Sequence, residues 1–153
     1  MTGADRKSEL ARAYTVRRPN EHDNQRILEV MDEWWGDLGG TLGSQQRALL
    51  LPRLFFQHFT RTSLIVERDD ARFAAFLVGF VSQSQEQVAY IHFVGVDPEL
   101  RRAGLGAAVY ASFFEDVADE ESDLYVASPA PVILFQWPFT NASGSRSTPA
   151  TQS

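Results

Sequence analysis

The spacing of apolar residues along the chain predicts the order of its helices and strands. Residues 14–19 are a short run typical of a strand, and a proline and an asparagine terminate it. Residues 22–35 then have the three- and four-residue spacing of an amphipathic helix, with apolar side chains at Ile27, Val30, Met31 and Trp34. The glycine-rich sequence GDLGGTLG follows, so we expect this helix to end there.

A second helix is expected over residues 47–59. Ser44 stands at the position of its N-cap, where a serine hydroxyl commonly accepts a hydrogen bond from a backbone N–H. Pro52 lies inside this stretch and has no N–H of its own, so we expect the helix to kink or to restart at that point.

Runs rich in Val, Ile, Phe and Tyr predict three strands, at residues 62–70, 72–83 and 86–97. Short polar turns connect these strands, which favours an antiparallel meander. The next stretch, residues 104–117, is rich in alanine and predicts another helix. Its apolar stripe consists of Leu105, Val109, Phe113 and Val117.

The two ends of the chain differ from this central part. Residues 1–12 are polar and charged, and we expect them to form a disordered tail. Residues 119–139 are an atypical segment, with a run of acidic residues followed by an apolar stretch that three prolines interrupt. Residues 140–153 have low complexity and are also expected to be disordered. The predicted domain is therefore residues 13–118.

Composition narrows the classes of function. The chain has 153 residues and no cysteine, so disulfides, thiolate metal sites and cysteine nucleophiles are excluded. The histidines are scattered, and no metal site is expected. The net charge is −6 and Lys7 is the only lysine, which argues against binding to nucleic acid. The sequence has neither an apolar run of membrane-helix length nor a signal-peptide core, so we expect a cytoplasmic protein without a membrane partner.

The sequence VGVDPELRRAGLGAA, at residues 94–108, contains the clearest candidate for chemistry. Gly104 and Gly106 stand where the last predicted helix begins. A helix N-terminus has unpaired N–H groups and a partial positive charge, and glycine lets a ligand approach the backbone. Arg101 and Arg102 add two cations that can bind phosphate. The arrangement suits a pyrophosphate, although a helix that merely begins with glycines has the same pattern.

These residues resemble motif A of the GNAT N-acetyltransferases, in which Arg/Gln-x-x-Gly-x-Gly/Ala follows a Val-x-Val strand end. The resemblance covers roughly residues 14–118 and implies an α/β fold, with a mixed, mostly antiparallel sheet flanked by helices on both faces. It also implies acetyl-CoA as cosubstrate, a small-molecule or peptide amine as acceptor, and direct attack of a neutral primary amine on the thioester. The implied cofactor-binding residues are Val94, Val96, Arg101, Arg102, Gly104, Gly106 and Ala107.

Direct attack requires a base for the ammonium proton and an acid for the departing thiolate. If the strand alternates regularly, Tyr90, His92 and Val94 share one face. Tyr90 or His92 then stands where the family often has a carboxylate, and an imidazole can act as a base near neutral pH. The alternative for His92 is a structural role, held by its strand neighbours. Glu86 is a more distant candidate for the base.

Two further features leave the function open. Trp34 and Trp35 either floor the acceptor pocket, because family acceptors bind beside the first helices, or pack in the core and at its border. Motif B, the next block of the family, is absent after residue 118 or is encoded in another reading frame, which would leave the fold incomplete at the C-terminus. That second feature implies an alternative function, a CoA-binding or interaction domain with impaired catalysis. A homodimer is left open.

Overall fold

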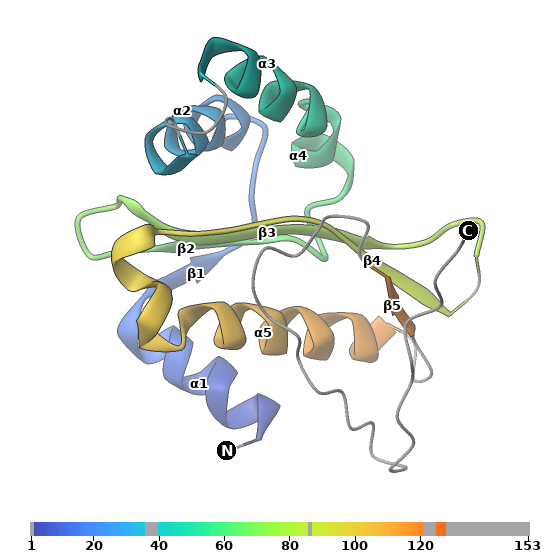
Figure 1. Ribbon diagram of the computed structural model, residues 1–153. Coiled ribbons are helices and arrows are strands. Elements are labelled where there is room, and N and C mark those ends of the chain that lie inside the picture. The colour runs from blue at the N-terminus through green and yellow to red at the C-terminus, as the bar shows by residue number, and fades with distance from the viewer. Residues whose placement is uncertain (1, 36–39, 86, 121–124, 128–153) are drawn as a thin grey trace.

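The computed structural model describes residues 2–35, 40–85, 87–120 and 125–127. The elements in chain order are α1 (Gly3–Ala13), β1 (Thr15–Arg17), α2 (Asp23–Trp35), α3 (Gly40–Leu50), α4 (Leu54–His58), β2 (Leu64–Glu67), β3 (Phe73–Val81), β4 (Val88–Val96), the 3₁₀ helix η1 (Pro98–Ala103), α5 (Leu105–Glu120) and β5 (Tyr125–Ala127). One sheet lies between two layers of helices: α2, α3 and α4 cover one face, and α1 and α5 cover the other (Figure 1).

The strands lie in the order β1-β2-β3-β4-β5 across the sheet. The first four pair in antiparallel fashion, so the predicted meander of three strands is confirmed and β1 extends it. β5 pairs in parallel with the start of β4, where Val88 lies opposite Tyr125 and Tyr90 lies opposite Ala127. The observed fold is therefore the expected one, a mixed and mostly antiparallel sheet with helices on both faces.

Each face of the sheet has its own hydrophobic core. On one face, the apolar stripe predicted for residues 104–117 is buried against β2, β3 and β4, which confirms the helical period of α5. On the other face, β2 and β3 pack against α2 and α4. The core there contains Ile27, Met31, Leu51, Phe56, Ile65, Phe73, Phe76 and Val78.

Helix α1 lies where a disordered tail was expected, at residues 1–12. Its N-terminus is a capping box, in which Thr2 accepts the backbone N–H of Asp5 and Asp5 accepts the backbone N–H of Thr2. Leu10 is buried in the α5 core, and Lys7 lies 3.0 Å from Asp116 of α5. The expectation of a disordered tail was therefore wrong. One buried apolar residue gives no helical pattern in the sequence, and it is the contacts with α5 that stabilise α1.

The helix predicted over residues 47–59 is two helices, because Pro52 interrupts it and α4 begins after the proline. α3 also begins earlier than expected, and Ser44 is not its N-cap. The hydroxyl of Ser44 donates instead to Asp32 of α2 at 2.8 Å, and Arg47 reaches the same carboxylate at 3.1 Å. These polar contacts join α2 to α3.

The pairing of β3 with β4 contains a register shift. Val78 lies opposite Phe93, whereas the next residue, Gly79, lies opposite Ile91. His92 therefore has no partner on β3 and is the extra residue of a β-bulge. Because side chains alternate between the two faces of a strand, one extra residue moves all side chains beyond it to the opposite face from the one that regular alternation predicts.

The bulge overturns the prediction that Tyr90, His92 and Val94 share one face of β4. Tyr90 and His92 lie on the face covered by α4, where the ring of His92 stacks on Phe55 at 4.3 Å. Val94 lies on the other face and packs against the α5 core. The prediction assumed that side chains alternate regularly along β4, and the bulge breaks this alternation. Nothing in the local sequence indicates the extra residue.

An ion-pair network around the buried carboxylate of Asp23 joins β1, α2 and β2. Arg17 donates to both carboxylate oxygens of Asp23, at 2.8 and 2.7 Å, and to Glu67 at 2.8 Å. Asp23 is 1% exposed and also accepts the backbone N–H of Asn20. Arg26, one turn further along α2, lies 3.5 Å from the same carboxylate. The network fixes the first turn of α2 to the edge of the sheet.

Candidate active site

The candidate anion site lies where β4 passes into α5. η1 carries Arg101 and Arg102 in its last turn, and both side chains are exposed. Gly104 follows with a φ of 74° and a ψ of 8°, a left-handed conformation that favours glycine. A Cβ at Gly104 would have nothing within 4 Å, so the space in front of this backbone is open.

The first turn of α5 presents backbone N–H groups at this loop. The N–H of Ala108 donates to the carbonyl of Gly104 at 3.2 Å. The N–H groups of residues 105–107 come before it and have no acceptor within the helix. Together with the positive end of the helix dipole and the two arginines, these groups favour a bound anion such as a phosphate.

The outer edge of β4 borders the same loop. β5 pairs only with residues 88–90, so no strand among the described residues lies beside the rest of this edge. The side chains of Val94 and Val96 pack against the α5 core. A ligand at this edge can therefore contact these two residues only through their backbone groups. Gly106 is close to Val96, since a Cβ there would lie 3.8 Å from the valine side chain. Arg101 donates to the carbonyl of Val96 at 3.4 Å.

Asp97 holds the loop in place, and it was missed at the level of sequence. One carboxylate oxygen accepts the backbone N–H of Glu99 at 2.9 Å and so caps η1. The other oxygen accepts from Arg68 in the turn between β2 and β3. The Val-Asp-Pro sequence was a signal for the cap, because aspartate is a favoured N-cap residue. Its partner Arg68 is 29 residues away in the chain, and no sequence pattern indicates that the two residues pair.

His92 lies under α3 and α4, on the face of β4 opposite the α5 core. Its Nε2 makes a hydrogen bond with the backbone carbonyl of Leu50. A carbonyl only accepts, so we assign the proton to Nε2 and the lone pair to Nδ1. His92 therefore joins α3 to the sheet and retains one basic nitrogen. Both of its predicted roles, structural partner and base, are compatible with this geometry.

Tyr90 is the neighbour of His92 on the same face, with ring centroids 6.2 Å apart. Its ring stacks on Phe80 of β3 at 5.1 Å. The two predicted catalytic residues are thus brought together within an aromatic cluster. Glu86, the more distant candidate for the base, lies outside the described residues.

Trp34 and Trp35 are half-buried at the end of α2. Trp34 stacks on Phe76 at 6.1 Å, and Trp35 packs edge-on against Phe93 at 6.0 Å. The ring of Phe76 requires a glycine at position 95, because a Cβ on Gly95 would clash with that ring, and it would also lie 3.0 Å from the indole of Trp35. These contacts support the packing role, and a contribution to an acceptor pocket stays a prediction.

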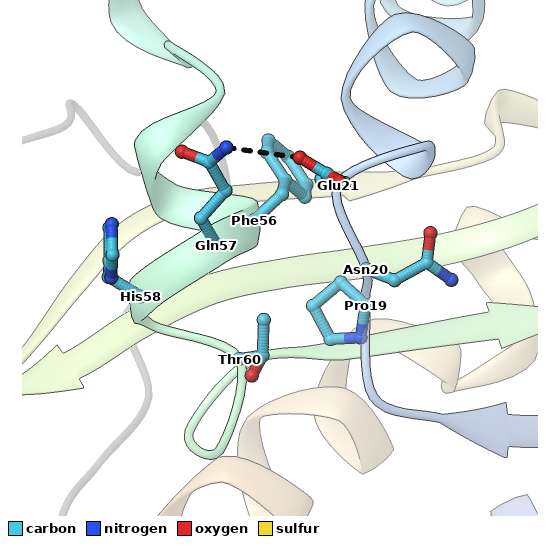
Figure 2. Close-up of a pocket in the computed structure, with 7 residues that line it drawn as sticks. All are labelled: Pro19, Asn20, Glu21, Phe56, Gln57, His58 and Thr60. Atoms are coloured by element: carbon cyan, nitrogen blue, oxygen red, sulfur yellow. Dashed lines mark hydrogen bonds between the residues drawn. The ribbon is translucent and has the colours of Figure 1, made fainter.

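Two of the surface hollows among the described residues lie away from Gly104 and the first turn of α5. The larger, of about 500 Å³, lies between the β1–α2 connection and the end of α4, and Gln57 donates to Glu21 there at 3.0 Å (Figure 2). None of the predicted site residues lines it. The smaller, of about 210 Å³, lies between α2 and the β2–β3 turn and has Trp34 and Asp97 in its wall.

The described parts of the chain contain no group of three His, Asp or Glu side chains that could hold a metal ion. No helix in these parts is both long enough and apolar enough to cross a membrane.

Several solved acetyltransferases have a similar fold. A GCN5-related N-acetyltransferase from Sphaerobacter thermophilus matches with a TM-score of 0.58 at 15% identity, over 76% of this chain and 38% of that one. Ard1 from Thermoplasma volcanium matches with a TM-score of 0.55 at 20% identity, over 76% and 70%. An aminoglycoside 6'-N-acetyltransferase from Acinetobacter baumannii matches with a TM-score of 0.51 at 19% identity, over 78% and 81%. The chain thus spans well under half of the first of these proteins.

No curated protein matches the sequence significantly. The sequence pattern described as the acetyltransferase (GNAT) family does match, over residues 27–129. This match runs from α2 through the meander, the loop and α5 to the end of β5, and covers more than half of the chain. The resemblance of residues 94–108 to motif A is therefore confirmed, and the chain belongs to the GNAT acetyltransferase family.

Proposed function

We propose that the protein is a cytoplasmic enzyme that transfers the acetyl group of acetyl-CoA to the primary amine of an acceptor. The acceptor is a small molecule or a peptide. The observation that carries the proposal is the loop of η1 and Gly104 at the start of α5, beside the part of the β4 edge with which no described strand pairs. Membership of the GNAT family supports the reaction type, and this site supports the cosubstrate.

The loop between β4 and α5 fits the pyrophosphate of CoA. Its free N–H groups and its exposed guanidinium groups match the charge of two phosphates. The open space before Gly104 gives the phosphates access to the backbone. No strand of the described part of the chain pairs with the outer edge of β4 beyond Tyr90, and this edge offers backbone groups to the amides of the pantetheine arm. The proposed cofactor-binding residues are Val94, Val96, Arg101, Arg102, Gly104, Gly106 and Ala107.

Acetyl-CoA supplies a thioester, which a neutral amine can attack directly. The amine nitrogen bonds to the carbonyl carbon, the C–S bond breaks, and the sulfur leaves as a thiolate that is then protonated. The chain itself has no cysteine that could form an acyl-enzyme. Nδ1 of His92 is the proposed acceptor of the ammonium proton, directly or through a water, and Tyr90 is the neighbouring candidate for proton transfer.

The role of His92 is tested by His92→Gln. Glutamine can keep an N–H donor toward the carbonyl of Leu50, but it cannot take up a proton. We expect kcat to fall by about 100-fold or more, the acidic limb of its pH profile to disappear, and the Kd of acetyl-CoA to stay unchanged. Steady-state rates across pH, with calorimetry for the Kd, provide the measurement. An unchanged pH profile would assign His92 to the structural role alone.

The bracing of the loop is tested by Asp97→Ala. The change removes the cap of η1 and the partner of Arg68, and loss of a cap typically costs about 1 kcal/mol. If binding must restore the loop, the Kd of acetyl-CoA should rise by about fivefold. Glu99→Ala is the control, because that side chain is 78% exposed and lies 3.6 Å from Arg68. Equal affinities in the two variants would contradict the bracing role.

The proposed cosubstrate is tested by calorimetry with acetyl-CoA and with acetylpantetheine, which has the thioester arm but no pyrophosphate. Because the loop is proposed to bind the phosphates, acetyl-CoA should bind much more tightly, and the difference should shrink as salt is added. Equal affinity for the two compounds would contradict the assignment of the loop.

A further inference from the structure

Three exposed leucines lie within six residues of one another at the junction of α3 and α4, and we call them the leucine surface: Leu49, Leu50 and Leu54. Their exposed fractions are 81%, 50% and 44%. Large apolar side chains that gather on the outside of a domain mark a contact with another molecule. Leu42 is also exposed, but it lies two helical turns earlier in α3, about 10 Å along the axis, and is not part of this surface.

The leucine surface adjoins the proposed base. The carbonyl of Leu50 accepts the Nε2 proton of His92, and Phe55, the residue after Leu54, stacks on the His92 ring at 4.3 Å. The ring centroids of Phe55 and Phe80 are also 6.4 Å apart, and the ring of Phe80 stacks on Tyr90. The described contacts of His92 on this face are therefore with apolar or aromatic residues of α3, α4 and the sheet.

The segment that forms the leucine surface has no acidic residue. The chain contains twenty Asp and Glu, yet none lies at residues 38–66, where three arginines and one histidine supply the charge. Among the described residues, two carboxylates from neighbouring elements contact these helices, and both accept hydrogen bonds from them. Asp32 accepts from Ser44 and Arg47, and Glu21 accepts from Gln57. Neither α3 nor α4 itself carries a carboxylate that could pair with a second positive charge on an acceptor.

We propose that the acceptor amine is attached to an apolar group that has no second positive charge, as in the N-terminus of a peptide whose first side chains are apolar. This inference rests on the proposed function. An apolar substituent gains from burial against the leucine surface. A polyamine would instead lose water from its additional cations and gain no counter-charge there. The leucine surface therefore selects the class of acceptor.

The test compares two probes, the amidated tripeptide Leu-Leu-Ala and spermidine. Binding of each probe to the CoA-loaded full-length protein is measured by calorimetry, and acetylation is measured by release of free thiol. We expect the peptide to be preferred by at least about tenfold in both measurements. Leu50→Glu should remove most of this preference, and Leu54→Glu provides an independent second variant. Leu42→Glu is the control and should keep the preference.

Three results would overturn the inference. Spermidine could bind as well as the peptide, or Leu50→Glu could behave like Leu42→Glu. Sedimentation could also find a stable dimer that Leu49→Glu dissociates, because a second copy of the chain would then cover the leucine surface. Failure of the wild-type protein to bind CoA in the first titration would reject the proposed function itself, and the inference with it, so the two failures are distinguishable.

Discussion

Gly104→Asp is expected to abolish the binding of acetyl-CoA while the protein keeps its fold. Gly104 has a φ of 74°, which Asp and Asn tolerate better than other residues with a side chain, and a Cβ there meets nothing within 4 Å. The new carboxylate would therefore occupy the space proposed for the pyrophosphate. At about 4 Å it repels one phosphate charge by about 4 kcal/mol at an effective dielectric of 20, close to three powers of ten in Kd.

Gly104→Asn is the matched control for this prediction. Asparagine has the same size as aspartate and tolerates the same backbone conformation, but it has no charge. We expect it to weaken binding much less than Gly104→Asp does, and both variants should keep the wild-type melting temperature within a few degrees. Calorimetry and thermal unfolding measure the two effects. Wild-type affinity in Gly104→Asp would mean that the phosphates do not bind at this loop.

Asp23→Ala is expected to cause a large loss of stability. Asp23 is 1% exposed and accepts two hydrogen bonds from Arg17 and one from the backbone of Asn20. Its removal leaves the half-buried Arg17 with Glu67 as its remaining carboxylate partner, beside the backbone carbonyl of Arg18. Breaking a buried ion pair from one side typically costs about 3 kcal/mol or more, and we expect that change in the free energy of unfolding. Urea denaturation provides the measurement.

An exposed ion pair of similar length provides the control. Asp70 and Arg72 are 2.7 Å apart, but their side chains are 53% and 66% exposed. Water screens such a pair, so Asp70→Ala should change the free energy of unfolding by less than about 1 kcal/mol. Equal losses in Asp70→Ala and Asp23→Ala would show that burial of the Asp23 network contributes nothing to stability.

The Asp23 network also predicts how stability depends on acid. Burial alone would raise the pKa of Asp23, but the hydrogen bonds from Arg17 and Asn20 and the charge of Arg26 outweigh it and lower the pKa. A lowered pKa in the folded state contributes stability that is fully present above the unfolded value, about 3.9, and is lost as the pH falls through the folded value. The wild type should therefore lose more stability than Asp23→Ala below about pH 4.

Features confined to one segment could be predicted from the sequence. The stripe of α5 has the helical period and is buried as expected, because one helix face packs on one sheet. The three strands of the meander are apolar runs joined by short polar turns, and neighbouring strands usually pair. The loop at residues 94–108 is also local, since its strand end, glycines and helix start are contiguous in sequence.

Features that depend on distant contacts could not be predicted. The bulge at His92 depends on how β3 and β4 align, and it is the bulge that brings Tyr90 and His92 to the α4 face. With regular alternation from Val94, both side chains would have pointed toward the α5 core. The bracing of Asp97 requires Arg68 from another turn, and α1 is fixed by the charges and the apolar face of α5. The secondary-structure propensity of residues and the spacing of apolar positions contain no information about partners that lie far apart in the chain.

Amine-dependent release of free thiol from acetyl-CoA tests the central claim most directly. The full-length protein is incubated with acetyl-CoA and a panel of primary amines, including the apolar peptide, and the thiol of CoA is read by a colorimetric reagent. The account predicts thiol release that requires an amine, that yields the acetylated amine in equal amount, and that Gly104→Asp eliminates. Tight CoA binding without amine-dependent release across the panel would contradict acetyl transfer and would identify a CoA-binding domain with impaired catalysis.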